Sequence, residues 1–440
     1  MHGIMERHVS NPANPLLKRT VVRFIDAAGE DIVFTHGQGC HVFDRKGRRF
    51  LDCVLGYGPV VLGHADERFN ARIADALGKG IHFPGFADAH DEYVAKLVAV
   101  SGLKSPVAPS FMKTSSEANT AAIRIASLVT GRKGVLRCGF TGWHDSQHAR
   151  SPSWHAPPGH RMPLRNTEGL RGVSGDEEVF NWISLDPEDL GALLDTYGHR
   201  IACLILDAFQ FAFVERDVIL GAIAQCRRHG IMVVLDETKT AGRVSPLGVA
   251  GHCEDAWDML VLGKAIGNGA PISMLLVKEA FRDPALKAQV GGTHSKELLS
   301  VHCALATMDR MQEADGHRIL GNAGSAMADL FNACVRQLGL SEALAMVPVF
   351  GGSLLDIRMR DDLYADPALL RKLQASFLAR GVLLLVGHPF FISLAHDGAV
   401  DAWREAFLDA LGDWWKAVSN DDMAKRSAGP VAIGNSLVAS

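Results

Sequence analysis

Residues 259–277 read MLVLGKAIGNGAPISMLLV, in which two apolar runs flank a segment that holds one lysine and three glycines. Short runs of branched apolar residues predict strands buried on both faces, one at each end of this stretch. Lys264 follows the first of them, after a single glycine, Gly263. The commoner situation for such a lysine is a surface position with its ammonium in water. The alternative is a partly dry amine, in space cleared by Gly267 and Gly269, that loses its proton and attacks a carbonyl.

Apolar runs of the same kind recur through the middle of the chain and alternate with amphipathic helical patterns. This alternation predicts an α/β fold with a central sheet that is mostly parallel. A hairpin is predicted ahead of the sheet, at His41–Asp52, around a turn at Lys46–Gly47. The other predicted strands are Gly134–Cys138, Ile201–Leu206 and Ile231–Leu235, and the predicted helices are Glu117–Leu128 and Val218–His229.

The change of pattern along the chain predicts how it divides into domains. Residues 69–315 are expected to form a large α/β domain. Residues 316–420, which are richer in helices, are expected to form a smaller α+β domain to which the N-terminal segment 1–68 contributes. Residues 421–440 have weak periodicity and are expected to be a flexible tail.

Composition argues against several classes of protein. The chain has 440 residues, of which 48% are hydrophobic and 21% charged, as in ordinary globular proteins. A formal net charge of -4 gives no electrostatic reason to expect nucleic acid or an anionic membrane as a partner. Without a signal-peptide core or a run of about 18 apolar residues, a cytoplasmic protein is expected. Eight scattered cysteines without a CxxC pair indicate neither disulfides nor a zinc site, and no metal is expected.

Three side chains of chemical interest directly follow apolar runs: Asp236, Lys264 and Phe140. In an open α/β sheet, ligands bind beyond the carboxyl ends of the strands, so these residues are expected in one site. Taken singly, Asp236 is more simply a turn carboxylate and Phe140 a core residue.

The stretch KTSSEAN (residues 113–119) adds a helix start at which Ser115 and Ser116 precede Glu117. Free backbone N–H groups, hydroxyls and the positive end of a helix together bind phosphate, although an ordinary N-cap is the commoner role. Pyridoxal phosphate requires a phosphate-binding site, an aromatic ring that stacks on its own ring, a carboxylate and an unusual lysine. The lysine holds its aldehyde as a Schiff base, and the carboxylate keeps the pyridine nitrogen protonated.

The chain as a whole resembles the class III aminotransferases of pyridoxal-phosphate fold type I, in the branch similar to glutamate-1-semialdehyde aminomutase. The resemblance implies that residues 69–315 form the cofactor-binding domain. It rests on TSSEAN (114–119), GFTGWHD (139–145), DETKTAGR (236–243), LGKAIGNGAPIS (262–273) and GGTHSKELLS (291–300), together with FLDCVLGYGPVVLGHAD (50–66) near the start and FFISLAHD (390–397) near the end.

The resemblance implies roles for individual residues. Lys264 matches the Schiff-base lysine, which then moves a proton between substrate and cofactor, and Asp236 matches the partner of the pyridine nitrogen. Phe140 matches the residue stacked on the ring. Thr293 matches a threonine that reaches the phosphate of the neighbouring subunit, which implies a homodimer with shared active sites. The phosphate-binding motif of the family corresponds to Thr114, Ser115 and Ser116.

The chain also departs from the family pattern, and the departures concern the substrate. Ser115 stands where glycine is usual, and Asp207 and Ala208 replace a Glu-Pro pair. Lys239 stands where relatives have an uncharged residue beside the 3′ oxygen of the cofactor. Candidates for contact with the substrate are Lys239, Arg23 and Trp143.

Three functions follow from these observations. The first is an aminotransferase that moves an amino group from an amino donor to an aldehyde or ketone by a ping-pong mechanism, possible acceptors being amino-sugar precursors or other secondary metabolites. The second is an isomerase with the same cofactor, an aminomutase or a racemase. The third is a non-catalytic homologue that binds a phosphate ligand, which leaves Lys264 and Asp236 unexplained.

Overall fold

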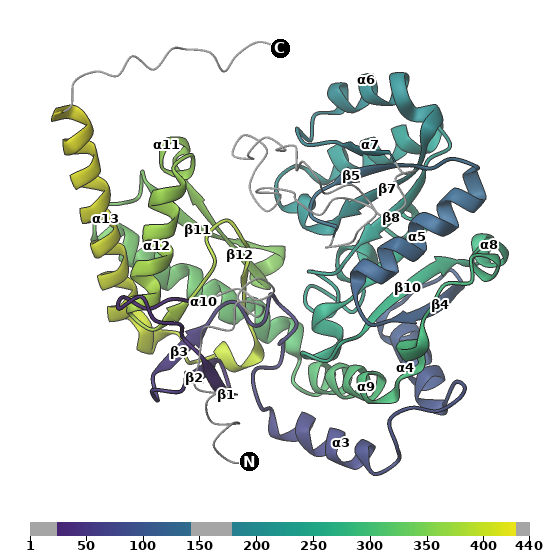
Figure 1. The fold of residues 1–440 in the computed structure, drawn as a ribbon, viewed down its shortest axis with the longest axis horizontal. Helices are drawn as coiled ribbons and strands as arrows, with labels where there is room; N and C mark the ends of the chain where they lie inside the picture. Colours follow the sequence, from purple (N-terminus) through teal and green to yellow (C-terminus); the bar gives the residue numbers. More distant parts are fainter. Residues whose placement is uncertain (1–23, 142–177, 428–440) are drawn as a thin grey trace, which may run out of the picture.

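A mixed sheet forms the centre of the larger of two lobes in the computed structural model, which describes residues 24–141 and 178–427 (Figure 1). Within those residues the sheet has seven strands in the order β4-β10-β9-β8-β7-β5-β6. Only β10 runs antiparallel to its neighbours, so the expectation of a mostly parallel sheet is confirmed. The strands are β4 (Val107–Met112), β5 (Gly134–Cys138), β6 (Val179–Asn181), β7 (Ile201–Asp207), β8 (Met232–Asp236), β9 (Met259–Leu262) and β10 (Ser273–Lys278).

Helices cover both faces of this sheet, which explains why its strands are apolar throughout. Every residue of β5, β7, β8 and β9 is buried, as expected for strands covered on two sides. The predicted strands match these elements to within about one residue. The helices of this lobe are α3 (Glu67–Leu77), α4 (Asp88–Ser101), α5 (Ser115–Thr130), α6 (Pro187–Tyr197), α7 (Arg216–Arg228), α8 (Arg282–Lys287) and α9 (Leu298–Glu313).

Helix α5 begins two residues before the predicted start because Thr114 is its N-cap. The Thr114 hydroxyl accepts a hydrogen bond from the Glu117 backbone N–H at 3.2 Å, and the Glu117 carboxylate accepts one from the Thr114 N–H at 3.0 Å. This reciprocal pair is a capping box, which satisfies N–H groups that the helix itself cannot. The helix ends at Gly131, whose φ of +69° is a left-handed conformation that glycine adopts without strain.

The smaller lobe brings together segments from both ends of the chain. Strands β1 (Phe34–Gln38), β2 (His41–Asp44) and β3 (Arg49–Asp52) form the predicted hairpin region, and β13 (Val382–Leu383) pairs parallel to β3. A second small sheet has the order β11-β12-β14. Its strands and the helices of the lobe are β11 (Leu344–Val349), β12 (Leu354–Met359), β14 (Phe390–Phe391), α10 (Gly316–Gln337), α11 (Asp361–Tyr364), α12 (Pro367–Ala379) and α13 (Arg404–Ser427).

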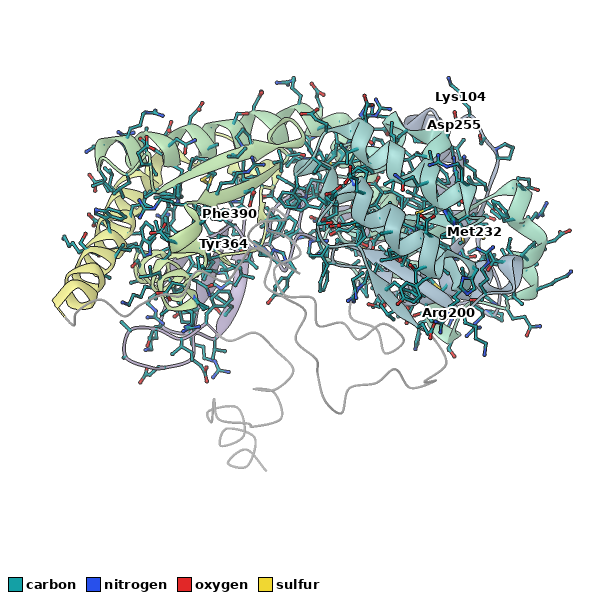
Figure 2. The ribbon with its side chains drawn as sticks, turned by 90° about the horizontal axis from the view of Figure 1, so that it is seen from above. Lys104, Arg200, Met232, Asp255, Tyr364 and Phe390 are labelled. Carbon is teal, nitrogen blue, oxygen red and sulfur yellow. The ribbon has the colours of Figure 1, made fainter. Side chains whose placement is uncertain are left out.

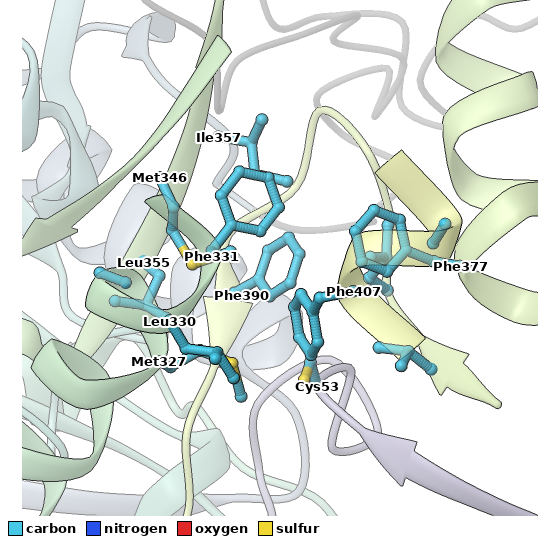
Figure 3. Close-up of a cluster of buried hydrophobic side chains, with 14 of the residues drawn as sticks. Cys53, Met327, Leu330, Phe331, Met346, Leu355, Ile357, Phe377, Phe390 and Phe407 are labelled. Carbon is cyan, nitrogen blue, oxygen red and sulfur yellow. The ribbon is translucent and has the colours of Figure 1, made fainter. Parts of the chain in front are cut away.

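An aromatic core holds the smaller lobe together (Figure 3). The rings of Phe377 and Phe407 lie 5.3 Å apart between α12 and α13, and Phe331 from α10 stacks 6.2 Å from Phe377. Cys53, which follows β3, belongs to the same cluster. This core therefore joins residues that are more than 300 positions apart, whereas Met232 and Arg200 lie in the other lobe (Figure 2).

The domain boundaries expected from sequence stay predictions, with one difference to report. Helix α13 continues to Ser427, past position 421, at which a flexible tail was expected to begin. All eight cysteines are buried, and none of them forms a disulfide. Among residues 24–141 and 178–427, no helix is long and apolar enough to cross a membrane. The same residues contain no group of histidine, cysteine and acidic side chains arranged to hold a metal ion.

Candidate active site

The predicted site residues that follow strands lie along one edge of the large sheet. Strands β5, β7, β8 and β9 are parallel neighbours, so their carboxyl ends meet at this edge. Asp236 is the last residue of β8, Lys264 follows β9, and Phe140 lies two residues beyond β5. Asp207 ends β7 and is in register with Asp236. The structure therefore brings together the residues that sequence singled out, with a second carboxylate between them.

Asp236 is buried, and its carboxylate is fixed by two neighbours. Its Oδ2 accepts a hydrogen bond from Asn119 Nδ2 at 2.8 Å, and its Oδ1 accepts from the backbone N–H and hydroxyl of Thr238. Asn119 also donates to the Thr141 carbonyl at 2.7 Å, so its amide orientation is set. Burial raises the pKa of Asp236, and the negative charge of Asp207 raises it further. A carboxylate in such surroundings favours a positively charged partner.

Lys264 opens a tight turn, Lys264–Gly267, between β9 and β10. Its φ of +49° is a left-handed conformation that residues with a side chain seldom adopt. Asn268, at the end of the turn, accepts a hydrogen bond from the Leu62 N–H at 3.0 Å and so ties the turn to the smaller lobe. Burial lowers the pKa of Lys264 to about 7, and the positive charge of Lys239 contributes. The amine is therefore partly neutral at pH 7, which is the form that attacks carbonyls.

The start of α5 lies against Gly263, the residue before Lys264. A Cβ atom on Gly263 would lie 2.3 Å from Ser115 Oγ, and Ser273 Oγ lies 3.4 Å from the same oxygen. The Gly263 backbone is extended, so this position needs glycine for space rather than for conformation. The first N–H groups of a helix have no acceptor within the helix. Together with the hydroxyls of Ser115 and Ser116, these N–H groups can bind an anion next to the lysine.

Lys239 and Asp207 form a buried ion pair that fixes Phe140. The Lys239 Nζ lies 2.6 Å from Asp207 Oδ2, and both side chains are at most 2% exposed. The same oxygen accepts a hydrogen bond from the Phe140 N–H at 3.2 Å, while Lys239 Nζ donates to the Phe140 carbonyl at 3.2 Å. Lys239 Nζ also lies 5.3 Å from the centre of the Phe140 ring. The pair thus holds the aromatic residue by both of its backbone polar groups.

Arg243 is fully buried and connects the site to two segments of the smaller lobe. Its guanidinium donates to the carbonyl of Gly58 at 2.9 Å and to the carbonyl of Ile392. Its Cζ lies 5.2 Å from the centre of the Phe391 ring. Burial lowers the pKa of Arg243 to about 9. Arg243 is the last residue of the run DETKTAGR, to which the sequence alone assigns no role.

Three rings of the smaller lobe are in contact with one another, and one of them lies beside the lysine. Lys264 Nζ lies 5.7 Å from the centre of the Phe391 ring. The His388 ring lies 5.6 Å from Phe391 and 5.5 Å from Tyr57. Sequence reasoning missed Tyr57 and His388 as site residues, as it missed Asn119. The signals were present in the quoted runs, GYGP for Tyr57 and SSEAN for Asn119, whereas His388 lies just before FFISLAHD.

Other predicted residues are not part of this cluster within one chain. Thr114 uses its hydroxyl as the cap of α5. Thr293 is exposed on the short turn Thr293–Lys296. Arg23 and Trp143 lie outside the described residues. The contact of Lys239 with a substrate, and the roles of Thr114 and Thr293 toward a phosphate, stay predictions.

Comparison with known proteins identifies the family. A family model described as aminotransferase class-III matches residues 25–400, which is most of the chain. The chain belongs to the class III aminotransferases. The resemblance inferred from the sequence is thereby confirmed.

Relatives of this class III chain include both aminotransferases and aminomutases. A 2'-deamino-2'-hydroxyneamine transaminase of Streptomyces kanamyceticus is 26% identical over 385 residues, covering 87% of this chain and 91% of the relative. A glutamate-1-semialdehyde 2,1-aminomutase of Thermus thermophilus is 26% identical over 438 residues, covering 93% of this chain and 99% of the relative. Among solved structures, an omega-transaminase from Sphaerobacter thermophilus superposes with a TM-score of 0.76 at 20% identity, covering 93% and 99% of the two chains, which supports the fold.

Proposed function

We propose that this class III chain is a pyridoxal-phosphate-dependent aminotransferase that moves an amino group between an amino donor and an aldehyde or ketone. One observation carries the proposal. A lysine amine with a pKa lowered to about 7 lies at the carboxyl edge of the sheet, together with a buried carboxylate, Asp236, and the start of α5. Family membership supports the same conclusion.

The residues present fit pyridoxal phosphate. Ser115 and Ser116 would hold the phosphate at the start of α5, against the space that Gly263 leaves open. Phe140 would lie against the ring. Asp236, whose pKa is raised by burial and by Asp207, is a carboxylate that gains most from a cationic N–H partner such as a pyridinium.

When bound, pyridoxal phosphate supplies an aldehyde that takes up the amine and a ring that withdraws electrons from the neighbouring carbon. Lys264 Nζ, partly neutral at pH 7, would hold that aldehyde, and as a base it would take a proton from the substrate carbon. Asp236 would keep a proton at the ring nitrogen. Lys239 and Asp207 keep Phe140 in place by their hydrogen bonds to its backbone.

The experiment is a half-reaction without an acceptor. The purified holoenzyme is mixed with single amino donors, and its visible absorbance and the released oxo acid are followed. An aminotransferase should convert its cofactor to the amine form and stop after one equivalent of oxo acid. Lys264→Ala should bind the cofactor without a covalent link and lose this conversion by orders of magnitude. A protein that remains colourless when loaded, or a Lys264→Ala variant as active as wild type, contradicts the proposal.

The alternative function is an isomerase, and the aminomutase relative that covers 93% of this chain favours it. An aminomutase or racemase returns the amine or the proton to its own substrate. It should therefore exchange α-deuterium of a donor with solvent and release no oxo acid. That result in the half-reaction favours the isomerase over the aminotransferase.

We further propose a homodimer in which Thr293 reaches the phosphate bound by the partner subunit. The turn that carries Thr293 lies beside an apolar surface: Ile81, Phe83 and Phe86 are 46%, 41% and 71% exposed. The Leu298 N–H donates to the Ile81 carbonyl at 2.8 Å, so this segment runs along the end of the turn. Exposed apolar patches of this kind mark protein contacts.

The proposal places the enzyme in the cytoplasm. All eight cysteines are buried and outside disulfides, which supports this location, because disulfides accumulate in oxidising compartments and are rare in reducing ones.

A further inference from the structure

A cavity of about 240 Å³ lies where the larger lobe passes into the smaller one. Helices α4 and α9, which pack against each other in the lower part of Figure 1, form two of its sides. The loop after β8, the turn after β9 and the start of α10 also contribute to its wall. Lys264, Asp236 and Phe140 are not among its described lining residues, so the cavity is separate from the candidate active site.

The wall of the cavity is mainly apolar. Helix α4 contributes Leu97 and Val100. Helix α9 contributes Met308 and Met311, whose flexible thioethers contact aromatic rings favourably. No charged side chain is among the described lining residues. An ion would therefore lose its water of hydration without gaining a partner, which favours an uncharged ligand.

Two polar groups of the wall lack a partner. Tyr93 on α4 is 1% exposed, and its hydroxyl makes no hydrogen bond to any residue of the described ranges. The buried Nε2 atom of His317, at the start of α10, has no hydrogen-bond partner there either. Unpaired buried donors and acceptors cost stability, and nearly all of them in folded proteins are paired. These two groups therefore point to a ligand that carries a polar atom of its own.

A hydroxyl group on the ligand matches both of these polar groups. Because a hydroxyl donates and accepts, it can pair with the phenol of Tyr93 and with Nε2 of His317 in either tautomer. Burial lowers the pKa of His317 from 6.5, so its ring is largely neutral at pH 7 and does not call for an anion. Thr307, also on the wall, donates its hydroxyl hydrogen to the Cys303 carbonyl at 2.7 Å and so offers the ligand only an acceptor.

Close contacts between the segments around the cavity keep it open. Gly242 and Ile266 both line it, and a Cβ atom on Gly242 would lie 3.4 Å from the Ile266 backbone nitrogen. A Cβ atom on Gly316 would lie 2.6 Å from Met311 Sδ. Segments packed this closely resist moving inward, so the cavity is preformed, as small-molecule sites usually are. An apolar cavity of roughly 150 Å³ holds one benzene molecule, and this larger one suits one or two fused rings.

We propose that this cavity is a second ligand site, which binds an uncharged aromatic molecule of one or two rings that carries a hydroxyl group. The hydroxyl pairs with Tyr93 and His317, and the rings lie against the apolar side chains of α4 and α9. The site does not depend on the proposed aminotransferase function, because the residues assigned to the cofactor are not among its described lining residues.

The test compares three probes that share one pair of fused rings. The probe 2-naphthol carries a hydroxyl, naphthalene carries no polar group, and 2-naphthoate carries a negative charge. Each is titrated at pH 7 into the enzyme loaded with pyridoxal phosphate, and the fluorescence of the rings reports binding. The enzyme should bind 2-naphthol most tightly, naphthalene about fivefold less tightly and 2-naphthoate too weakly to measure. A cavity that holds only water would leave 2-naphthol unbound, and this result overturns the inference, as does tighter binding of 2-naphthoate.

Two substitutions in the wall separate the role of the hydroxyl from that of the space. Tyr93→Phe keeps the ring and removes its hydroxyl, so it should weaken binding of 2-naphthol about fivefold and leave that of naphthalene within about twofold. Val100→Trp, at a half-buried position, should occupy the space of the rings and weaken both probes by about tenfold or more. Equal losses of both probes in Tyr93→Phe, or wild-type binding in Val100→Trp, would overturn the inference.

Two further variants show where the probe binds. Tyr197→Phe is the matched control, because Tyr197 packs against Phe180 at the far edge of the sheet, and it should bind all three probes as wild type does. Lys264→Ala should also bind 2-naphthol as wild type does. A loss in Lys264→Ala as large as that in Tyr93→Phe would place the probe in the cofactor site and overturn the inference. Failure of every amino donor in the half-reaction would overturn only the proposed function.

Discussion

At the residue scale, the lowered pKa of Lys264 has a direct consequence for loading. A lysine with its pKa lowered from 10.5 to about 7 is protonated in the fold below pH 7 and neutral above it. Only the neutral amine attacks an aldehyde. We expect the rate at which cofactor-free protein recombines with pyridoxal phosphate to rise with pH, with a midpoint near 7, as measured by stopped-flow absorbance. Lys264→Arg should show no covalent phase at any pH, and a rate independent of pH in wild type would contradict the assignment.

The lowered pKa of Lys264 also makes the stability of the fold depend on pH. Between pH 7 and 10.5 the unfolded chain keeps the proton on this lysine while the folded chain has released it. The free energy of unfolding of the cofactor-free protein therefore rises with pH through that window, because the cost of burying the charge on Lys264 disappears. Below pH 7 both states hold the proton, and Lys264 contributes no further change with pH.

The Lys239–Asp207 pair allows a sharper test. Lys239→Met leaves Asp207 charged, buried and without its cation, which costs about 3–5 kcal/mol of stability in comparable sites. Asp207→Asn combined with Lys239→Met removes both charges, keeps an oxygen for the Phe140 N–H and should recover most of the loss. Urea denaturation of the three proteins measures this. Equal destabilisation by the single and double substitutions would mean that the charges are not coupled.

At the element scale, sequence located the strands and their chemically important ends because both features are local. A strand buried on two faces is an apolar run, and the residue after it is read directly from the sequence, as for Asp236 and Lys264. The start of α5 was less certain, because the hydroxyl residues ahead of Glu117 could either cap the helix or bind a phosphate. The structure gives Thr114 the capping contact.

The close approach of β9 to the start of α5 leads to a prediction at this scale. Gly263→Ala places a methyl group 2.3 Å from the position of Ser115 Oγ. The Ser115 hydroxyl must then rotate away from the proposed phosphate-binding site at the start of α5. We expect retention of cofactor after dilution to fall by about tenfold, as for a lost hydrogen bond to an anion. Ser115→Ala should do the same, and the double variant should be no worse. Gly221→Ala, in open space on α7, is the control, and additive losses would contradict a shared cause.

At the scale of the whole molecule, sequence could not supply contacts between distant segments. Arg243 joins Gly58 and Ile392, and the ring of Tyr57 contacts that of His388. Each of these residues lies in an ordinary local pattern. What makes them part of the site is the way the two lobes meet, which no periodicity or spacing encodes.

The proposed dimer gives the prediction for this scale. Phe86→Asp puts a charge into the apolar surface beside the Thr293 turn, and burying an unpaired charge is costly. We expect sedimentation at micromolar concentration to show monomers, with faster loss of cofactor than in wild type. Leu286→Asp, at an exposed apolar position on α8, should leave the mass unchanged. A wild-type protein that sediments as a monomer, or a Phe86→Asp dimer, would contradict the proposal.

Arg243 also limits how the enzyme opens. A single guanidinium, seven residues along from the carboxylate at the end of β8, bonds to backbone from both ends of the chain. If the lobes swung apart at this point, a buried cation would lose both acceptors at once. Separation of the lobes at this point is therefore costly, and a motion that admits a substrate has to leave both of these hydrogen bonds in place.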